Sequence, residues 1–191
     1  TDAVLEVRAN DVDFMLINKD HNNLYLASKN GLLSYIDIGD KAKPVIKQQL
    51  NVLDVGAEIT AMEFLNGDLS VLVGDSKGFV SQWSMVRDAQ NHSAMQKLRS
   101  FKVSENPIVA INPEARRKGF ITTDNKGQVG IYYTTSEREL IKEPVANSSP
   151  VALALAPRAN GFLLESADGQ IHAWQVENEH PEISFKSLWQ K

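Results

Sequence analysis

One short pattern occurs four times along the chain, and it limits the possible fold more than any other feature of the sequence. Each copy consists of an apolar run, a tight turn that contains glycine, and a second apolar run that ends in a large side chain. The copies are LYLASKNGLLSYI (24–36), VLVGDSKGFVSQW (71–83), FITTDNKGQVGIY (120–132) and FLLESADGQIHAW (162–174). The turn glycines, Gly31, Gly78, Gly127 and Gly169, are 47, 49 and 42 residues apart. Matching offsets in four copies indicate a structural repeat.

The residues around each turn glycine also match. Three residues before it stands a short side chain that can hydrogen-bond local backbone, namely Ser28, Asp75, Asp124 or Ser166. Five residues after it stands a large apolar side chain that we expect to pack between sheets, namely Ile36, Trp83, Tyr132 or Trp174. Asn-Gly and Asp-Gly pairs in the first and last copies predict type I′ turns, which need positive φ at both central residues. Lysine precedes the glycine in the other two copies, so we expect those turns to differ.

Further strand-like runs flank each hairpin. One precedes it, at 12–18, 59–66, 107–113 and 150–157, and another follows it, at 44–52, 97–103, 139–145 and 181–188. Four antiparallel strands in 42–49 residues are typical of one blade of a β-propeller. A β-sandwich of unrelated hairpins is the alternative, but it does not explain the matching offsets. The polar segment 84–96 is the one candidate for a turn of helix, and we interpret it as a long loop.

The repeats divide the whole chain, residues 1–191, into one all-β domain or part of one. The four blades are expected at about 11–55, 56–105, 106–147 and 148–191. Residues 1–10 resemble the fourth strand of a blade, so two arrangements remain open. This strand either completes the last blade and closes a four-bladed ring, or it belongs to a preceding blade of a larger ring. We favour the larger ring because such rings are commoner, and exposed blade faces would then favour self-association.

Composition excludes several classes of function. The chain has no cysteine, which excludes disulfides, thiolate metal sites and cysteine nucleophiles. Its net charge is −4, and its one basic triplet, 116–118, is expected in a solvated loop, so the sequence does not indicate nucleic-acid binding. The longest purely apolar run, 151–156, is far shorter than the ~18–20 residues of a membrane-spanning helix.

The sequence shows no pattern for catalysis, cofactor binding or metal binding. The four histidines, His21, His92, His172 and His180, form none of the paired spacings of metal sites. Asp75, Asp124 and Asp168 lie near glycines without the spacing of a calcium loop, so turn geometry explains them. Nucleophile elbows and phosphate-binding loops are absent too. We therefore expect a protein that is not an enzyme and has no cofactor.

Two resemblances carry the argument further. SADGQIHAW (166–174) is close to the blade consensus of WD40-like and quinoprotein-like propellers. ENEHPEISFKSLWQK (177–191) resembles the segment where the extracytoplasmic insert of large proteobacterial phosphate ABC-transporter permease subunits returns to the membrane. The likeness is carried by His180-Pro181-Glu182, then Phe185, then Leu188-Trp189. It implies a domain at the periplasmic face of the inner membrane, and no transport residue of that family lies in this chain.

The sequence thus predicts a non-catalytic extracytoplasmic propeller domain of a phosphate importer, acting as an interaction or regulatory module. Its expected partners are the importer's binding protein or another subunit. A general WD40-like interaction scaffold in the cytoplasm is the main alternative. A propeller enzyme is the third, but it would need several carboxylates or a cofactor cage converging on the ring axis, which the repeats do not show.

Overall fold

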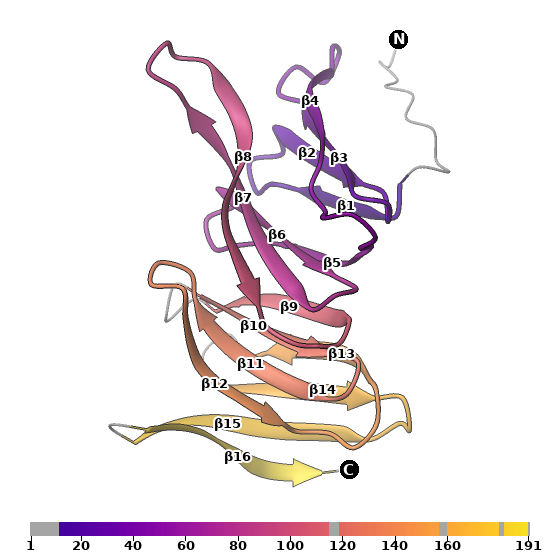
Figure 1. The fold of residues 1–191 in the computed structure, drawn as a ribbon, viewed down its shortest axis with the longest axis vertical. Coiled ribbons are helices and arrows are strands. Elements are labelled where there is room, and N and C mark those ends of the chain that lie inside the picture. Colours follow the sequence, from indigo (N-terminus) through magenta and orange to yellow (C-terminus); the bar gives the residue numbers. More distant parts are fainter. Residues whose placement is uncertain (1–11, 115–118, 157–159, 180–181, 191) are drawn as a thin grey trace.

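The computed structural model describes residues 12–114, 119–156, 160–179 and 182–190. These residues form sixteen strands and no helix (Figure 1). Sheet 1 contains β1 (Phe14–Ile17), β2 (Asn23–Ala27), β3 (Leu32–Asp37) and β4 (Val45–Asn51), and sheet 2 contains β5 (Ile59–Phe64), β6 (Ser70–Asp75), β7 (Phe79–Arg87) and β8 (Ser93–Lys102). Sheet 3 contains β9 (Ile108–Glu114), β10 (Gly119–Asp124), β11 (Gln128–Tyr133) and β12 (Arg138–Pro144), and sheet 4 contains β13 (Pro150–Leu155), β14 (Gly161–Ser166), β15 (Ile171–Glu179) and β16 (Glu182–Gln190).

Every sheet is an antiparallel meander in which the strands lie in chain order. The prediction of an all-β chain built from four four-stranded units is confirmed. The proposed strand at 1–10 and the basic triplet 116–118 lie outside the described residues. The part of the chain that the structure describes contains no helix long and apolar enough to cross a membrane.

The segment 84–96 was expected to be a long loop or a turn of helix, and this prediction is wrong. β7 continues through Arg87 and β8 begins at Ser93, with Val86 paired to Ala94. The segment is therefore the end of a hairpin that extends sheet 2 (Figure 1). Met85 and Met95 of this segment pack on the core between sheets 1 and 2, but residues 87–93 are all exposed, so little of the hairpin shows the alternation of a half-buried strand.

The four glycine turns share one geometry, and the predicted type I′ turns are wrong. Positive φ occurs at the glycine (80° to 99°), and the residue before it is not among those with positive φ. In the first copy Gly31 N donates to Ser28 O (2.9 Å) and Ser28 N donates to Leu32 O (3.0 Å). This is the three-residue hairpin loop in which a type I turn precedes a left-handed residue. Lysine fits immediately before the glycine, as Lys77 and Lys126 do, because φ at that position is not positive.

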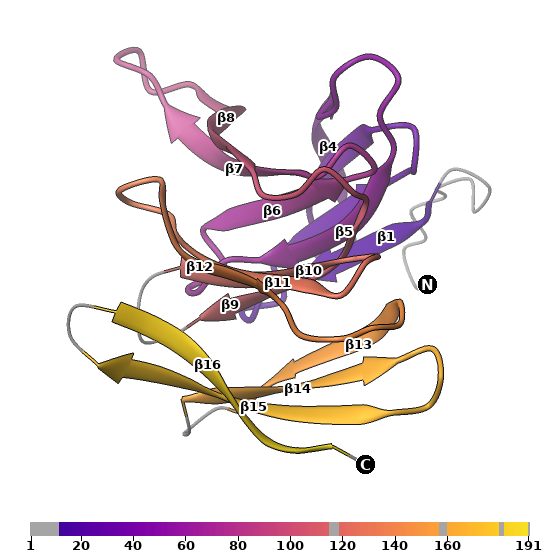
Figure 2. The same ribbon diagram turned by 60° about the horizontal axis from the view of Figure 1, so that its bottom comes forward.

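The sheets lie in a row, with apolar side chains between each consecutive pair. The first strands β1, β5, β9 and β13 contact one another in that order along the row (Figures 1 and 2). Tyr25, Leu33, Val71 and Val73 fill the space between sheets 1 and 2. Leu72, Phe101, Phe120 and Tyr132 fill the space between sheets 2 and 3, and Ile121, Ile131, Phe162 and Leu164 fill the space between sheets 3 and 4.

Burial along the strands follows from this arrangement. All six residues of β6 and all six of β10 are buried, because sheets 2 and 3 are covered on both faces. In β14 of sheet 4, buried and exposed residues alternate, so one face is covered. Leu163 and Ile171 are exposed on the other face of that sheet, and Met15 and Ile17 are exposed on β1 at the opposite end of the row.

Candidate functional site

Two hollows border the loop 65–69, which joins β5 to β6. Leu65 N donates to Ser70 O (2.9 Å), and Asp68 N donates to Leu65 O (3.0 Å), so the loop is a closed turn. Gly67 and Asp68 have φ of 86° and 56°. Glycine adopts this region freely and aspartate is one of the few side chains that tolerate it. The turn leaves Leu69 79% exposed.

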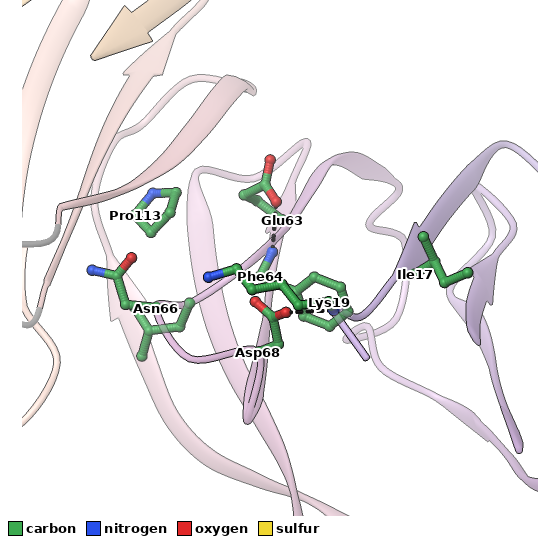
Figure 3. A pocket seen from close by; sticks show the side chains of 8 residues that line it. Ile17, Lys19, Glu63, Phe64, Asn66, Asp68 and Pro113 are labelled. Atoms are coloured by element: carbon green, nitrogen blue, oxygen red, sulfur yellow. Dashed lines mark hydrogen bonds between the residues drawn. The ribbon is translucent and has the colours of Figure 1, made fainter. Parts of the chain in front are cut away.

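The first hollow, of about 290 Å³, lies where the first strands of sheets 1, 2 and 3 meet. Figure 3 shows Ile17 of β1 on one side, Pro113 of β9 on the other, and Phe64 of β5 between them. Lys19 N donates to Asp68 Oδ2 (2.8 Å), which joins the β1–β2 loop to the loop 65–69. The hollow therefore has a fixed wall, held by a hydrogen bond between neighbouring sheets.

Tyr25 packs edge-on against Phe64, with ring centroids 5.4 Å apart. Burial, reinforced by Tyr35 and then Asp68, raises the pKa of Tyr25 to about 12. The phenol therefore stays protonated near neutral pH. Its ring supports this part of the core.

The second hollow, of about 510 Å³, lies between sheets 2 and 3 on the other side of the loop 65–69. Leu65 and Leu69 form part of its apolar lining. Its polar lining includes Ser70, Gln82 and Arg99 of sheet 2 and Thr134 from the turn between β11 and β12. We call this hollow the Arg99 well.

Hydrogen bonds fix the polar side of the Arg99 well. Gln82 and Arg99 stand opposite each other in the pairing of β7 and β8. Gln82 is buried, and its Nε2 donates to Ser70 Oγ (3.0 Å) while its Oε1 accepts from Arg99 Nη1 (3.4 Å). Arg99 Nε lies 3.4 Å from Glu137 Oε1 in an ion pair, yet Nε is buried and forms no hydrogen bond among the described residues. The guanidinium is positioned, but its donors are not fully used.

A third hollow, of about 180 Å³, lies beside Tyr132 and Glu139. The Tyr132 hydroxyl is 3.1 Å from Glu139 Oε2 and 3.2 Å from Val103 O. Burial raises the pKa of Tyr132, and Glu139 raises it further, so the hydroxyl keeps its proton. This arrangement ties sheet 3 to sheet 2 and has the features of a structural contact.

The predicted turn and packing residues occupy equivalent places in the four sheets. Ile36, Trp83, Tyr132 and Trp174 pair with the first apolar residue of the preceding strand, which is Leu24, Val71, Phe120 or Phe162. Pairing with the fourth strand of each sheet shifts by one residue at the same four positions. Ile36, Trp83 and Tyr132 are buried, and Trp174 is partly buried in the core between sheets 3 and 4. None of these residues, nor the turn glycines Gly31, Gly78, Gly127 and Gly169, lines the Arg99 well.

The histidines are dispersed. His172 is buried on β15, whereas His21 and His92 are exposed in loops, and His180 lies outside the described residues. His92 lies 3.5 Å from Asp88 at the end of the extended hairpin. No group of three or more histidine, aspartate or glutamate side chains that could hold a metal occurs within the described ranges.

Sequence reasoning missed the Arg99 well. Its polar lining comes from three strands and a turn that are distant in sequence, and only the pairing of β7 with β8 brings Gln82 to Arg99. The one local signal was Asn66-Gly67-Asp68, a turn sequence that places an apolar residue, Leu69, at an exposed position.

Comparisons with known proteins bear on the fold. No protein-family model matches the chain, and no curated protein matches it. Many solved structures are similar to it. One is the crystal structure of the computationally designed Ika8 protein, with 20% sequence identity and a TM-score of 0.71. The match covers 94% of this chain and 48% of the designed chain, so this chain spans about half that protein's length. At this identity the likeness shows the fold alone.

Proposed function

We propose that the four sheets are consecutive blades of a larger β-propeller. Their first strands follow one another along one row, as the inner strands of blades do. The outer faces of sheets 1 and 4 carry exposed apolar side chains, among them Met15 at one end and Leu163 and Ile171 at the other. Further blades would cover these faces, and the match to half of a longer chain supports the same view.

The function that this geometry supports best is protein binding by a rigid, non-catalytic domain. The observation that carries it is the loop 65–69, which borders two preformed hollows and presents the exposed Leu69 at the Arg99 well. Binding residues are commonly placed on loops that a rigid scaffold holds in position. Three apolar cores between four sheets form such a scaffold here.

As the biological setting, we propose the extracytoplasmic side of a phosphate importer's permease subunit. The support is the resemblance of residues 177–191 to the end of the insert domain in that family. The domain would then face the periplasm at the inner membrane and contact the importer's binding protein or another subunit. A WD40-like interaction scaffold in the cytoplasm is the second candidate, favoured by the same loop geometry. The presence or absence of membrane segments flanking the domain in the full gene separates the two.

Site-directed photo-crosslinking tests the importer proposal. A photoreactive amino acid replaces Leu69 in the full-length protein, and a control carries it at Val55, which is exposed on a different loop. We expect crosslinks from position 69 to the binding protein or another importer subunit, and fewer from position 55. Crosslinks to no importer component from either position would contradict the importer setting.

A further inference from the structure

We propose that the Arg99 well is a recognition site for an acidic side chain that lies next to an aliphatic one on an extended partner segment. This inference rests on the proposed function as a protein-binding domain, and it names the chemistry of the partner. Three features carry it: the positioned guanidinium of Arg99 with an unused Nε donor, its loosely held counter-ion Glu137, which lines the neighbouring third hollow, and the apolar rim of the well.

The guanidinium of Arg99 is held ready to bind a planar anion. Gln82 orients it through Oε1, and Gln82 is itself held by Ser70, so the position of Nη1 depends on a buried chain of hydrogen bonds. An arginine has five N–H donors, and carboxylates bind two of them side by side. Here the bond to Gln82 is long, at 3.4 Å, and the buried Nε donates none among the described residues. A carboxylate that replaced Glu137 beside Nε would accept from Nε and Nη2, the two donors on that side of the guanidinium.

Glu137 stands near the position that such a carboxylate would take, and it is held loosely. Its Oε1 is 3.4 Å from Arg99 Nε, longer than the ~2.7–2.9 Å of a charge-assisted hydrogen bond. Its side chain is 58% exposed, and exposed ion pairs contribute little to stability. Glu137 also sits in a turn with φ of 53°. Replacing it by a partner's carboxylate therefore has a small cost.

The shape of the well favours a peptide over a free anion. Its volume of about 510 Å³ falls in the range of ligand sites and exceeds the space that one carboxylate needs. Leu65 and the 79% exposed Leu69 offer apolar surface beside the polar lining. A phosphate ion would meet a single guanidinium beside the carboxylate of Glu137, and it would leave the leucines uncovered. An acidic residue followed by an aliphatic one uses both surfaces.

The test titrates the 191-residue chain with an N-acetylated, C-amidated tripeptide of leucine, aspartate and leucine, and follows backbone amides by NMR. We expect saturable shifts at residues 65–70, 82, 99 and 134–135. The same tripeptide with asparagine in place of aspartate, and Arg99→Gln with the acidic peptide, should both bind about tenfold more weakly or worse, because a hydrogen-bonded charge is lost. Arg99→Lys keeps the charge without the fork and should recover only part of the affinity.

Two further variants keep the inference testable if Arg99→Gln does not fold. Glu137→Gln removes the internal counter-ion and should strengthen binding of the acidic peptide by up to about fivefold. Arg87→Gln changes an exposed arginine at the end of β7 and should leave binding unchanged. Equal affinity for the aspartate and asparagine peptides, weaker binding in Glu137→Gln, or no saturable shift would overturn the inference. So would Arg99-dependent binding of inorganic phosphate without binding of the peptide. Peptide binding without importer crosslinks would contradict the importer setting alone, whereas crosslinks without peptide binding would contradict the Arg99 well alone.

Discussion

Gly78 and Gly169 occupy the same position in two copies of the repeat, and alanine should affect them very differently. Their φ angles are nearly equal, at 81° and 80°. A Cβ at Gly169 would meet nothing within 4 Å, whereas a Cβ at Gly78 would lie 2.0 Å from Ser104 O and 2.9 Å from Asn106 O. The pair therefore separates the cost of the left-handed backbone from the cost of a steric clash.

The expected difference follows from these contacts. Both variants place an alanine in the left-handed region, which costs roughly 1–2 kcal/mol. Gly78→Ala must also move the backbone at Ser104, and overpacking of this kind costs about 1–3 kcal/mol. Gly78 O accepts hydrogen bonds from Val103 N (3.0 Å) and Ser104 N (3.1 Å), and each is worth about 1 kcal/mol if the shift breaks it. We expect a loss of about 3–5 kcal/mol for Gly78→Ala and about 1–2 kcal/mol for Gly169→Ala.

Urea unfolding followed by circular dichroism measures the free energy of unfolding of both variants. Amide hydrogen exchange at Val103 and Ser104 supplies the local readout, and it should accelerate in Gly78→Ala and stay unchanged in Gly169→Ala. Equal losses of stability in the two variants would refute the reasoning, because the steric contact at Gly78 would then carry no cost.

Three other outcomes follow from the structure. Phe120→Ala should lower the free energy of unfolding, measured in urea, by about 3–5 kcal/mol, because Phe120 is fully buried between sheets 2 and 3. Leu69→Ala, at an exposed position, should be nearly neutral. Similar losses in the two variants would contradict the packing of Phe120 in the core between sheets 2 and 3. Asp124→Ala should cost more than Asp168→Ala in thermal melts, because Asp124 is buried and accepts two backbone N–H bonds in its turn, while Asp168 is exposed and accepts one. The free energy of unfolding should fall between pH about 10 and about 12, because the folded state keeps the Tyr25 proton that the unfolded state releases. Tyr25→Phe should make this fall shallower. An unchanged dependence of the unfolding free energy on pH in Tyr25→Phe would contradict the raised pKa of Tyr25.

The sequence was sufficient to predict the repeating units of the fold. Apolar runs on both sides of the four glycines predicted the hairpins, and the flanking runs predicted the first and fourth strands, all of which the structure contains. This worked because a strand between two other sheets is buried on both faces and reads as a continuous apolar run, as in 71–73. The repeat then distinguished such runs from buried helical segments.

Other features depend on tertiary structure and could not be predicted in this way. Asn30 and Asp168 match a type I′ turn locally, but all four turns have positive φ at glycine alone. Residues 87–93 at the end of the extended hairpin of β7 and β8 are all exposed, so this part of the sequence shows no strand pattern. The Arg99 well depends on which residues stand opposite each other across strands and on how sheet 3 meets sheet 2. No local pattern in a single sequence indicates which residues pair across strands or how two sheets pack together.

The distance between the two ends of the row tests the central claim most directly. The chain has no cysteine, so Met15→Cys on β1 and Val151→Cys on β13, both at exposed positions, can carry spin labels without background. Double electron–electron resonance then measures their separation. Three sheet junctions at about 10 Å each place β1 and β13 up to roughly 30 Å apart, and we expect one distance well beyond a single junction. A separation near one junction, as between packed neighbouring sheets, would mean that sheet 4 closes on sheet 1 and would contradict an open arc of blades.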